Sequence, residues 1–407
     1  MLHTAVVCPF CPLLCDDLEI ADEGGRLELR AGGCREARTR LAQLEPAGEP
    51  SVRGERRSYD EALAHAAALL ARARQPLISG LGCDVDGIRA ALRLAETVGA
   101  IVDHGASDGL FANLLAMQRQ GWVTATLAEI RNRADIVLFF GTDGGPWAEV
   151  LERRVLQPEA ALVTEAPARR RLFLGPGTPP PRTELAISWP AETLHRAAAI
   201  LRARLSGRRL ADGFEVAAID RLAASLRAAR YAAILWDAAA LPREIAEVTV
   251  AQLAGLLLEL NRTTRAVGLP LARSHHAVSA NQVCTWQWGV PLRTRVAADG
   301  PEPDPLAFAS DRLLARDEAD LLLWISAFGD LPLPRGTRPT IALLAPTSTA
   351  VAADVVLPVA VPGIDHAGTA FRMDQVVAMP LAALRSAPLP TVADVLDSLR
   401  ERIASSP

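Results

Sequence analysis

The sequence predicts an α/β protein with mainly parallel sheets, and three observations support this fold class. Helix-like and strand-like segments alternate along most of the chain from Ser58 onward. The strand-like segments are short, nearly continuous apolar runs, as expected for strands buried on both faces. The 407 residues are 50% hydrophobic and 22% charged, which is enough apolar material for two or three domains.

Composition excludes several classes of protein. There are 43 basic and 47 acidic residues, so a nucleic-acid partner is not expected. Every basic residue is Arg, which excludes a Schiff-base lysine and a P-loop lysine. The sequence has no signal-like N-terminus and no apolar run of about 18 residues. We therefore expect a cytoplasmic protein without a membrane span.

Residues 1–55 are expected to form a small N-terminal domain rich in cysteine. Strand-like runs at Leu18–Ile20 and Leu27–Leu29 alternate with glycine turns. An arginine-rich helix is expected from Arg35 to Leu44 and is ended by Pro46. The segment has little apolar material, so a metal or a neighbouring domain should stabilise it.

Residues 56–103 and 214–407 are expected to form one α/β domain. Ser58 and Glu61 show a capping-box pattern at the start of its first helix. The first part predicts helix Tyr59–Arg72, strand Pro76–Ser79, helix Asp86–Val98 and strand Ala100–Asp103, which is a βαβ unit with parallel strands. The second part predicts strands Ala232–Trp236, Leu321–Ile325, Thr340–Leu344 and Val355–Pro358 and helices Val250–Asn261 and Val392–Ile403.

Residues 104–213 are expected to form an inserted α/β domain. Its predicted elements are helices Leu127–Arg131 and Ala191–Leu205 and strands Ile136–Phe140, Ala160–Thr164 and Leu185–Ile187. The segment 166–184 is rich in Pro, Gly and Arg and predicts a loop. Gly207 to Gly213 predicts the boundary with the next domain.

Four cysteines near the start of the chain predict a metal site. Cys8, Cys11 and Cys15 have C-x2-C-x3-C spacing, and Cys34 adds a fourth thiol. Thiolates are soft ligands that suit zinc or an iron–sulfur cluster. Two other interpretations remain open: the thiols are small buried hydrophobic groups, or they are a relict site that has lost its metal.

Several segments resemble one known family along nearly the whole chain. They are CPFCPLLCDDLEI with GGCREA, the block from Asp103 to Asp143, SANQVCTWQWGVPL and ADVVLPVAVPGIDHAGTAFRMD. These segments are similar to the B subunit of formylmethanofuran dehydrogenase, which belongs to the molybdopterin or tungstopterin oxidoreductase superfamily. The resemblance implies a formate-dehydrogenase-like fold with interleaved doubly wound domains. It also implies a [4Fe–4S] cluster at Cys8, Cys11, Cys15 and Cys34.

The sequence departs from the family at the catalytic pair. The resemblance implies a metal-ligating Cys followed by a His, and here these positions are Asp103 and His104. A carboxylate is a poor replacement for a thiolate toward a soft metal. Asp103 is alternatively a carboxylate that caps a strand end or helix, and His104 a hydrogen-bonded imidazole.

At other positions too, this chain lacks residues that the family uses to bind the pterin cofactor or for catalysis. After Ile136–Phe140 the family has a segment rich in Asn, His and Arg that contacts the pterin and its phosphates, whereas this chain has Gly141–Trp147, which includes Asp143. The family's catalytic arginine has only Arg293 or Arg295 as replacements. His275 and His276 predict polar packing, and His366 and Arg372 predict loop orientation.

These departures together resemble one branch of the family, the B subunit of the bacterial formyltransferase/hydrolase complex. The resemblance implies a non-redox scaffold without molybdopterin or tungstopterin, in contact with subunits A, C and D. The complex converts formyl-tetrahydromethanopterin to formate through a methanofuran-like carrier. The alternative is an active molybdenum or tungsten formylmethanofuran (or formate) dehydrogenase subunit, with Asp103 as a metal ligand.

Overall fold

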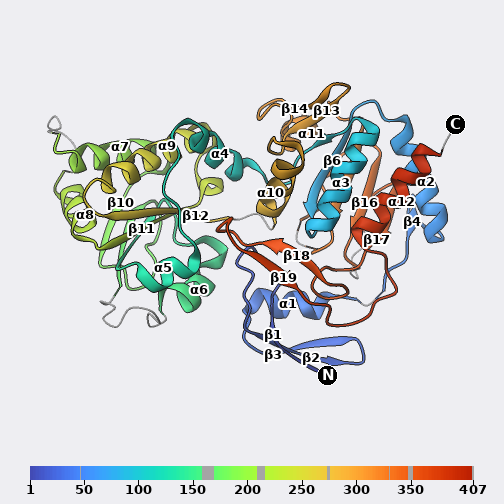
Figure 1. The fold of residues 1–407 in the computed structure, drawn as a ribbon, viewed down its shortest axis with the longest axis horizontal. Helices are drawn as coiled ribbons and strands as arrows, with labels where there is room; N and C mark the ends of the chain where they lie inside the picture. The colour runs from blue at the N-terminus through green and yellow to red at the C-terminus, as the bar shows by residue number, and fades with distance from the viewer. Residues whose placement is uncertain are drawn as a thin grey trace. The chain divides into compact units, whose positions relative to one another are not determined.

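The computed structural model in Figure 1 describes residues 1–45, 47–157, 169–208, 216–272, 276–329, 331–346 and 352–405. The chain divides into two compact units. The first joins Met1–Ser107 to Ser274–Pro407, and the second is the continuous segment Asp108–Arg273. The first unit is thus built from two separate stretches of sequence, as expected for interleaved domains. None of the described helices has the length and apolar character that crossing a lipid bilayer requires.

The N-terminal part of the first unit is a three-stranded antiparallel sheet followed by a helix. Strands β1 (Leu2–Val6), β2 (Leu18–Glu23) and β3 (Arg26–Ala31) lie in that order, and α1 (Arg35–Gln43) follows. The cysteine-containing loop connects β1 to β2. This part has its own sheet but belongs to the larger first unit, so it is not the separate compact domain expected from the sequence.

A nine-stranded sheet forms the centre of the first unit, with neighbours in the order β14-β13-β7-β6-β15-β16-β17-β4-β5. Its five central strands are parallel to one another, whereas the strands at both edges pair antiparallel. Each central strand is apolar and almost fully buried, which is typical of a sheet covered on both faces. The strands are β4 (Ser51–Val52), β5 (Glu55–Arg56), β6 (Pro76–Gly82), β7 (Ile101–Val102), β13 (Thr294–Ala297), β14 (Gly300–Pro303), β15 (Leu321–Ser326), β16 (Thr340–Leu344) and β17 (Val355–Pro358).

Helices and a hairpin complete the first unit. Ser58 and Glu61 form the predicted capping box at the start of α2. Helix α3 is capped by the Asp84 side chain, and α12 packs against both α2 and α3. The elements are α2 (Tyr59–Arg72), α3 (Val85–Val98), α10 (Ala277–Trp288), α11 (Ser310–Ala315), α12 (Val392–Ala404) and the antiparallel strands β18 (Gly368–Phe371) and β19 (Ala378–Leu381).

The second unit is a five-stranded, fully parallel sheet in the order β10-β9-β8-β11-β12. Its strands are β8 (Ile136–Phe140), β9 (Arg170–Gly175), β10 (Leu185–Ser188), β11 (Tyr231–Trp236) and β12 (Arg265–Pro270). One face of the sheet packs its alternate apolar residues against α4 (Asp108–Gln120), α7 (Leu194–Leu205), α8 (Val216–Ala228) and α9 (Arg243–Leu260). Helices α5 (Leu127–Arg133) and α6 (Ala148–Leu151) and the π-helix η2 (Glu152–Leu156) flank β8 in sequence.

Three expectations need correction or fall outside the described residues. The segment 166–184 is not simply a loop, because it contains β9. The inserted unit spans Asp108–Arg273 and not 104–213, because β11 and β12 join the same sheet as β8. The strand expected at Ala160–Thr164 lies outside the described residues.

Candidate functional site

Asp103 and His104 lie directly after β7, at its carboxyl end and beside the central strand β6. The Asp103 N–H donates to the Ile78 carbonyl at 3.2 Å, which extends the strand pairing by one residue. Asp103 is 1% exposed and His104 is 0% exposed. The Ala106 N–H donates to Nδ1 of His104 at 3.0 Å. Both side chains therefore belong to the interior of the first unit.

Arg293 provides the positive charge beside Asp103. Its N–H donates to the Val102 carbonyl at 2.9 Å, so the residue is aligned with the end of β7. Its Nε lies 3.7 Å from Oδ2 of Asp103. The guanidinium also donates to Ser107 Oγ at 2.9 Å and to the Pro305 carbonyl at 2.8 Å. These contacts hold the arginine in the interior with its donors directed at protein groups.

The carboxylate of Asp103 is part of a wider buried polar network. The Ser310 N–H, at the start of α11, donates to Oδ2 of Asp103 at 2.8 Å. Ser310 Oγ in turn lies 2.8 Å from Ser79 Oγ on β6. Burial raises the pKa of Asp103 from 3.8 to about 6, and Arg293 and Ser310 oppose that rise. Burial, with a contribution from Asp103, also raises the pKa of Cys284 to about 12.

The second arginine candidate is placed differently. Arg295 lies on β13 and pairs with Glu302 on β14 at 2.5 Å, with its side chain 43% exposed. Its guanidinium also lies 5.4 Å from the centre of the Phe308 ring. Of the two arginines suggested by the sequence, Arg293 is the one that reaches Asp103.

In the glycine-rich turn after β8, side chains of the turn accept hydrogen bonds from its own backbone N–H groups. Thr142 Oγ1 accepts from the Gly144 N–H at 3.1 Å, and Asp143 Oδ1 accepts from the Gly145 N–H at 2.9 Å. A phosphate needs such N–H groups free and a positive or neutral surrounding. Two donors of this turn are thus used within it, and the Asp143 charge opposes an anion there.

The four N-terminal cysteines lie close to one another and form no disulfide. Cys8, Cys11 and Cys15 are buried, and Cys34, which precedes α1, is partly exposed. Burial, with a contribution from the neighbouring thiols, raises the pKa of Cys8 and raises that of Cys11 to about 12. The Cys8 N–H donates to the Cys15 carbonyl at 2.7 Å, which closes the loop.

The three cysteines of the β1–β2 loop and Cys34 form a donor set that suits a [4Fe–4S] cluster, which takes one thiolate at each of its four irons. Within the described ranges, no group of three or more His, Cys, Asp or Glu side chains is arranged around the position of a single metal ion. By donor type, the three loop cysteines together with Cys34 suit either a cluster or a zinc ion.

The cysteine loop is attached to distant parts of the first unit. His276 Nε2 donates to the Pro9 carbonyl at 2.8 Å, and the imidazole stacks on Phe328 at 4.0 Å between ring centres. The Met373 N–H donates to the Pro12 carbonyl at 2.8 Å. His276 thus packs as a polar anchor of the loop.

The remaining sequence candidates occupy structural positions. His275 lies outside the described residues. Arg372 pairs with the buried Asp374 at 2.5 Å next to the β18–β19 hairpin. His366 lies near Asp84, the cap of α3, whose pKa is raised by burial and lowered in part by His366.

Sequence reasoning did not identify the partners that define the Asp103 network. These partners are isolated hydroxyl or thiol residues from separate parts of the chain: Ser107, Ser310 and Cys284. Their proximity follows from the pairing of β7 with β6 and β13 and from the placement of α10 and α11. No local pattern in the sequence marks them.

Similarity to known proteins was found at the level of sequence and structure, although no protein-family model matches the chain. The chain is 33% identical over 371 residues to the B subunit of the formyltransferase/hydrolase complex Fhc of Methylorubrum extorquens, covering 86% of this chain and 97% of that protein. It is 27% identical over 401 residues to the B subunit of the tungsten-containing formylmethanofuran dehydrogenase 2 of Methanocaldococcus jannaschii, with 91% of each chain covered. The corresponding dehydrogenase subunit from Methanococcus maripaludis is 26% identical over 400 residues, again with 91% of each chain covered.

A solved structure agrees with these sequence relatives. The fold matches a chain in the crystal structure of the formyltransferase/hydrolase complex from Methylorubrum extorquens, determined in complex with methylofuran. The TM-score is 0.77 and the sequence identity is 32%. The match covers 87% of this chain and 98% of the other.

Proposed function

The chain belongs to the family of B subunits of the formyltransferase/hydrolase complex, and from this membership we propose that it is the B subunit of such a complex. The complex would convert formyl-tetrahydromethanopterin to formate through a methanofuran-like carrier. This chain would act as a non-redox scaffold that assembles with subunits A, C and D. Neither nucleic acid nor a membrane is a partner in this proposal.

The buried Asp103–Arg293 pair is the observation that carries the proposal. By resemblance, Asp103 stands where the dehydrogenases have a cysteine that ligates the metal. Here the carboxylate is directed to Arg293 at 3.7 Å and to the Ser310 N–H at 2.8 Å. A carboxylate whose Oδ2 is engaged in this way, and which is buried beside its counterion, supports a structural role over the ligation of a soft metal.

The glycine-rich turn supports the same proposal independently. Its Gly144 and Gly145 N–H groups are bound by Thr142 and Asp143. These two donors are therefore engaged within the turn, which supports a turn that does not hold a pterin pyrophosphate. We propose that the chain binds neither molybdopterin nor tungstopterin.

The four cysteines are the feature that favours the alternative, an active dehydrogenase subunit. Cys8, Cys11, Cys15 and Cys34 would hold a [4Fe–4S] cluster, which supplies one-electron transfer when bound. Formyl transfer and hydrolysis move no electrons between centres, so the proposed function makes no use of this chemistry. The thiols then act as buried packing groups around the β1–β2 loop.

We infer that the protein acts in the cytoplasm. None of the six cysteines forms a disulfide, and five of them are buried. Cysteines without disulfides, with three crowded into one short loop, are typical of a reducing compartment.

Co-expression with subunits A, C and D of a related complex tests the proposal. We expect a stoichiometric assembly that contains no molybdenum or tungsten and releases formate from formyl-tetrahydromethanopterin. Complexes with Asp103→Ala or His104→Ala should release formate within about twofold of the parent, normalised to assembled protein. A hundredfold loss, one atom of Mo or W per chain, or a monomer that associates with no other subunit would overturn the assignment.

A further inference from the structure

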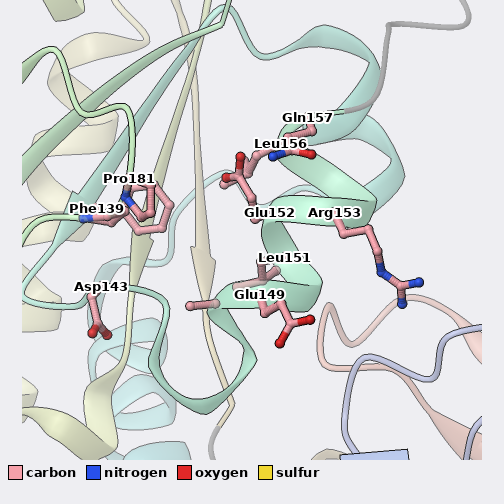
Figure 2. Close-up of a pocket in the computed structure, with 11 residues that line it drawn as sticks. Phe139, Asp143, Glu149, Leu151, Glu152, Arg153, Leu156, Gln157 and Pro181 are labelled. Atoms are coloured by element: carbon pink, nitrogen blue, oxygen red, sulfur yellow. The ribbon is translucent and has the colours of Figure 1, made fainter. Parts of the chain in front are cut away.

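The second unit contains a cavity of about 550 Å³ beside β8, which none of the roles above uses. Figure 2 shows its walls: Phe139 and Pro181 lie on one side, and α6 and η2 lie on the other. This volume lies in the range of pockets that enclose small organic molecules.

The inner surface of the cavity is mainly apolar. Phe139 contributes its ring from β8, and Leu151 and Leu156 contribute side chains from α6 and η2. Pro180 and Pro181 add two more apolar rings from the connection between β9 and β10. An aromatic ring and two prolines form the kind of flat apolar surface on which a planar group packs.

Two arginines near the start of β9 hold the walls in place. Arg171 is buried, pairs with Glu152 of η2 at 2.7 Å and donates to the Pro181 carbonyl at 3.0 Å, so it joins the two sides of the cavity. Arg169 donates to the Ala134 and Val155 carbonyls at 2.9 and 3.0 Å, near the ends of α5 and η2. A cavity whose walls are fixed in this way is organised before a ligand arrives.

The charged groups around the cavity are mostly acidic. Asp143, Glu149 and Glu152 line it, and Arg171 neutralises Glu152. Among the lining residues that the structure describes, Arg153 is the only basic one, and Figure 2 shows its side chain extending away from Phe139 and Asp143. The rim therefore favours a positive charge and disfavours phosphate.

The geometry points to a binding site for a small organic molecule with a planar ring and one positive charge, such as an arylmethylammonium ion. Its ring would pack on Phe139 and the two prolines, and its ammonium group would face Asp143, with Glu149 adding negative charge at the rim. The inference is independent of the proposed function and concerns binding alone. In this site the π-helix η2 forms one wall. Short π-helices are often found at functional sites.

Binding of three matched probes to the full-length chain tests the inference. Benzylamine, benzyl alcohol and benzoate share one ring and differ in charge, and ligand-observed NMR titration gives their dissociation constants. We expect benzylamine to bind at least tenfold more tightly than benzyl alcohol, and benzoate more weakly still. Equal affinity for the three probes would overturn the inference.

Variants locate the binding to the cavity. The double variant Asp143→Asn with Glu149→Gln should weaken benzylamine binding about tenfold and leave benzyl alcohol unchanged. Ala148→Phe, which fills the cavity, should abolish binding of all three probes. Glu192→Gln, an exposed carboxylate of the same unit outside the cavity, is the matched control and should change nothing. Binding that survives Ala148→Phe, in a variant with an unchanged melting temperature, would place the probes elsewhere and refute the site.

Discussion

The Arg293 guanidinium lies 3.7 Å from the Asp103 carboxylate, and neither side chain is more than 5% exposed. Two opposite charges in a protein interior stabilise one another only when their other donors and acceptors are also satisfied. Here Ser107 and Pro305 accept from Arg293 and the Ser310 N–H donates to Oδ2 of Asp103, whereas the buried Oδ1 of Asp103 has no hydrogen-bond partner among the residues that the structure describes. The pair is therefore a structural element of the first unit, and its removal should change stability more than activity.

Arg293→Met tests this directly. The variant leaves the Asp103 carboxyl buried without its counterion and removes the bonds to Ser107 and Pro305. We expect the free energy of unfolding to fall by about 3 kcal/mol, measured by urea denaturation. The control is Arg295→Met, whose guanidinium is 43% exposed and which should cost less than about 1 kcal/mol. Equal losses in the two variants would show that the buried pair has no special role.

The Asp103 carboxyl should also make stability depend on pH. Its pKa is raised from 3.8 to about 6, so the folded chain binds this proton more tightly than the unfolded chain does. Between these values the folded state holds more of the proton, and the unfolding free energy therefore falls as pH rises from about 4 to 6.

Asp103→Asn removes this titration and isolates its effect. The quantity to follow is the unfolding free energy of the parent minus that of Asp103→Asn. This difference should decrease by at most about 3 kcal/mol between about pH 4 and pH 7 and stay constant above about pH 7. Thermal or urea unfolding at a series of pH values measures the difference. A difference that increases with pH would mean that Arg293 lowers the pKa of Asp103 more than burial raises it.

Replacement of Cys11 tests the role of the N-terminal thiols. If the thiols are packing groups, Cys11→Ala costs about 1 kcal/mol of stability and leaves the formate release of the complex unchanged. Iron analysis and visible absorption of anaerobically purified parent complex should then show no cluster. About four irons per chain that Cys11→Ala removes, with loosening of residues 1–45, would contradict this expectation.

His276→Ala should loosen the cysteine loop without unfolding the unit. The variant loses the bond to the Pro9 carbonyl and the stacking on Phe328, a cost of about 1–2 kcal/mol. Hydrogen exchange of the Cys8 amide, which bonds to Cys15, should become at least tenfold faster. His195→Ala, in the second unit, serves as the control and should leave this amide unchanged.

The sequence alone predicted those elements whose signal is local. The capping box at Ser58, the buried strands β6, β15, β16 and β17, and the inserted arrangement of the domains all follow from short patterns or from the resemblance. Strand β9 was missed because it begins with Arg170 and Arg171, which are typical of a polar loop. Arg171 is tolerated in the strand because Glu152 neutralises it, and that contact is not visible in the local sequence.

The candidate site was predicted only in part, because some of its contacts join residues that are distant in the sequence. Asp103 and His104 could be identified by resemblance, and the four cysteines by their spacing. The choice between Arg293 and Arg295 depends on how each residue is placed relative to β7, and only the strand pairing fixes that register. The end of the inserted unit likewise depended on the pairing of β11 with β8.

The discontinuous first unit sets the order in which the chain can fold during synthesis. Strand β6 pairs with β15, which begins 245 residues later, at Leu321 compared with Pro76. At about 5–20 residues per second, the ribosome needs roughly 10–50 s to supply that partner. The second unit is continuous and can be completed within this interval. Throughout it the cysteine loop lacks the late contact from Met373, and for most of it the contact from His276, so any metal loading or oxidation of these cysteines has its best opportunity before the chain is released.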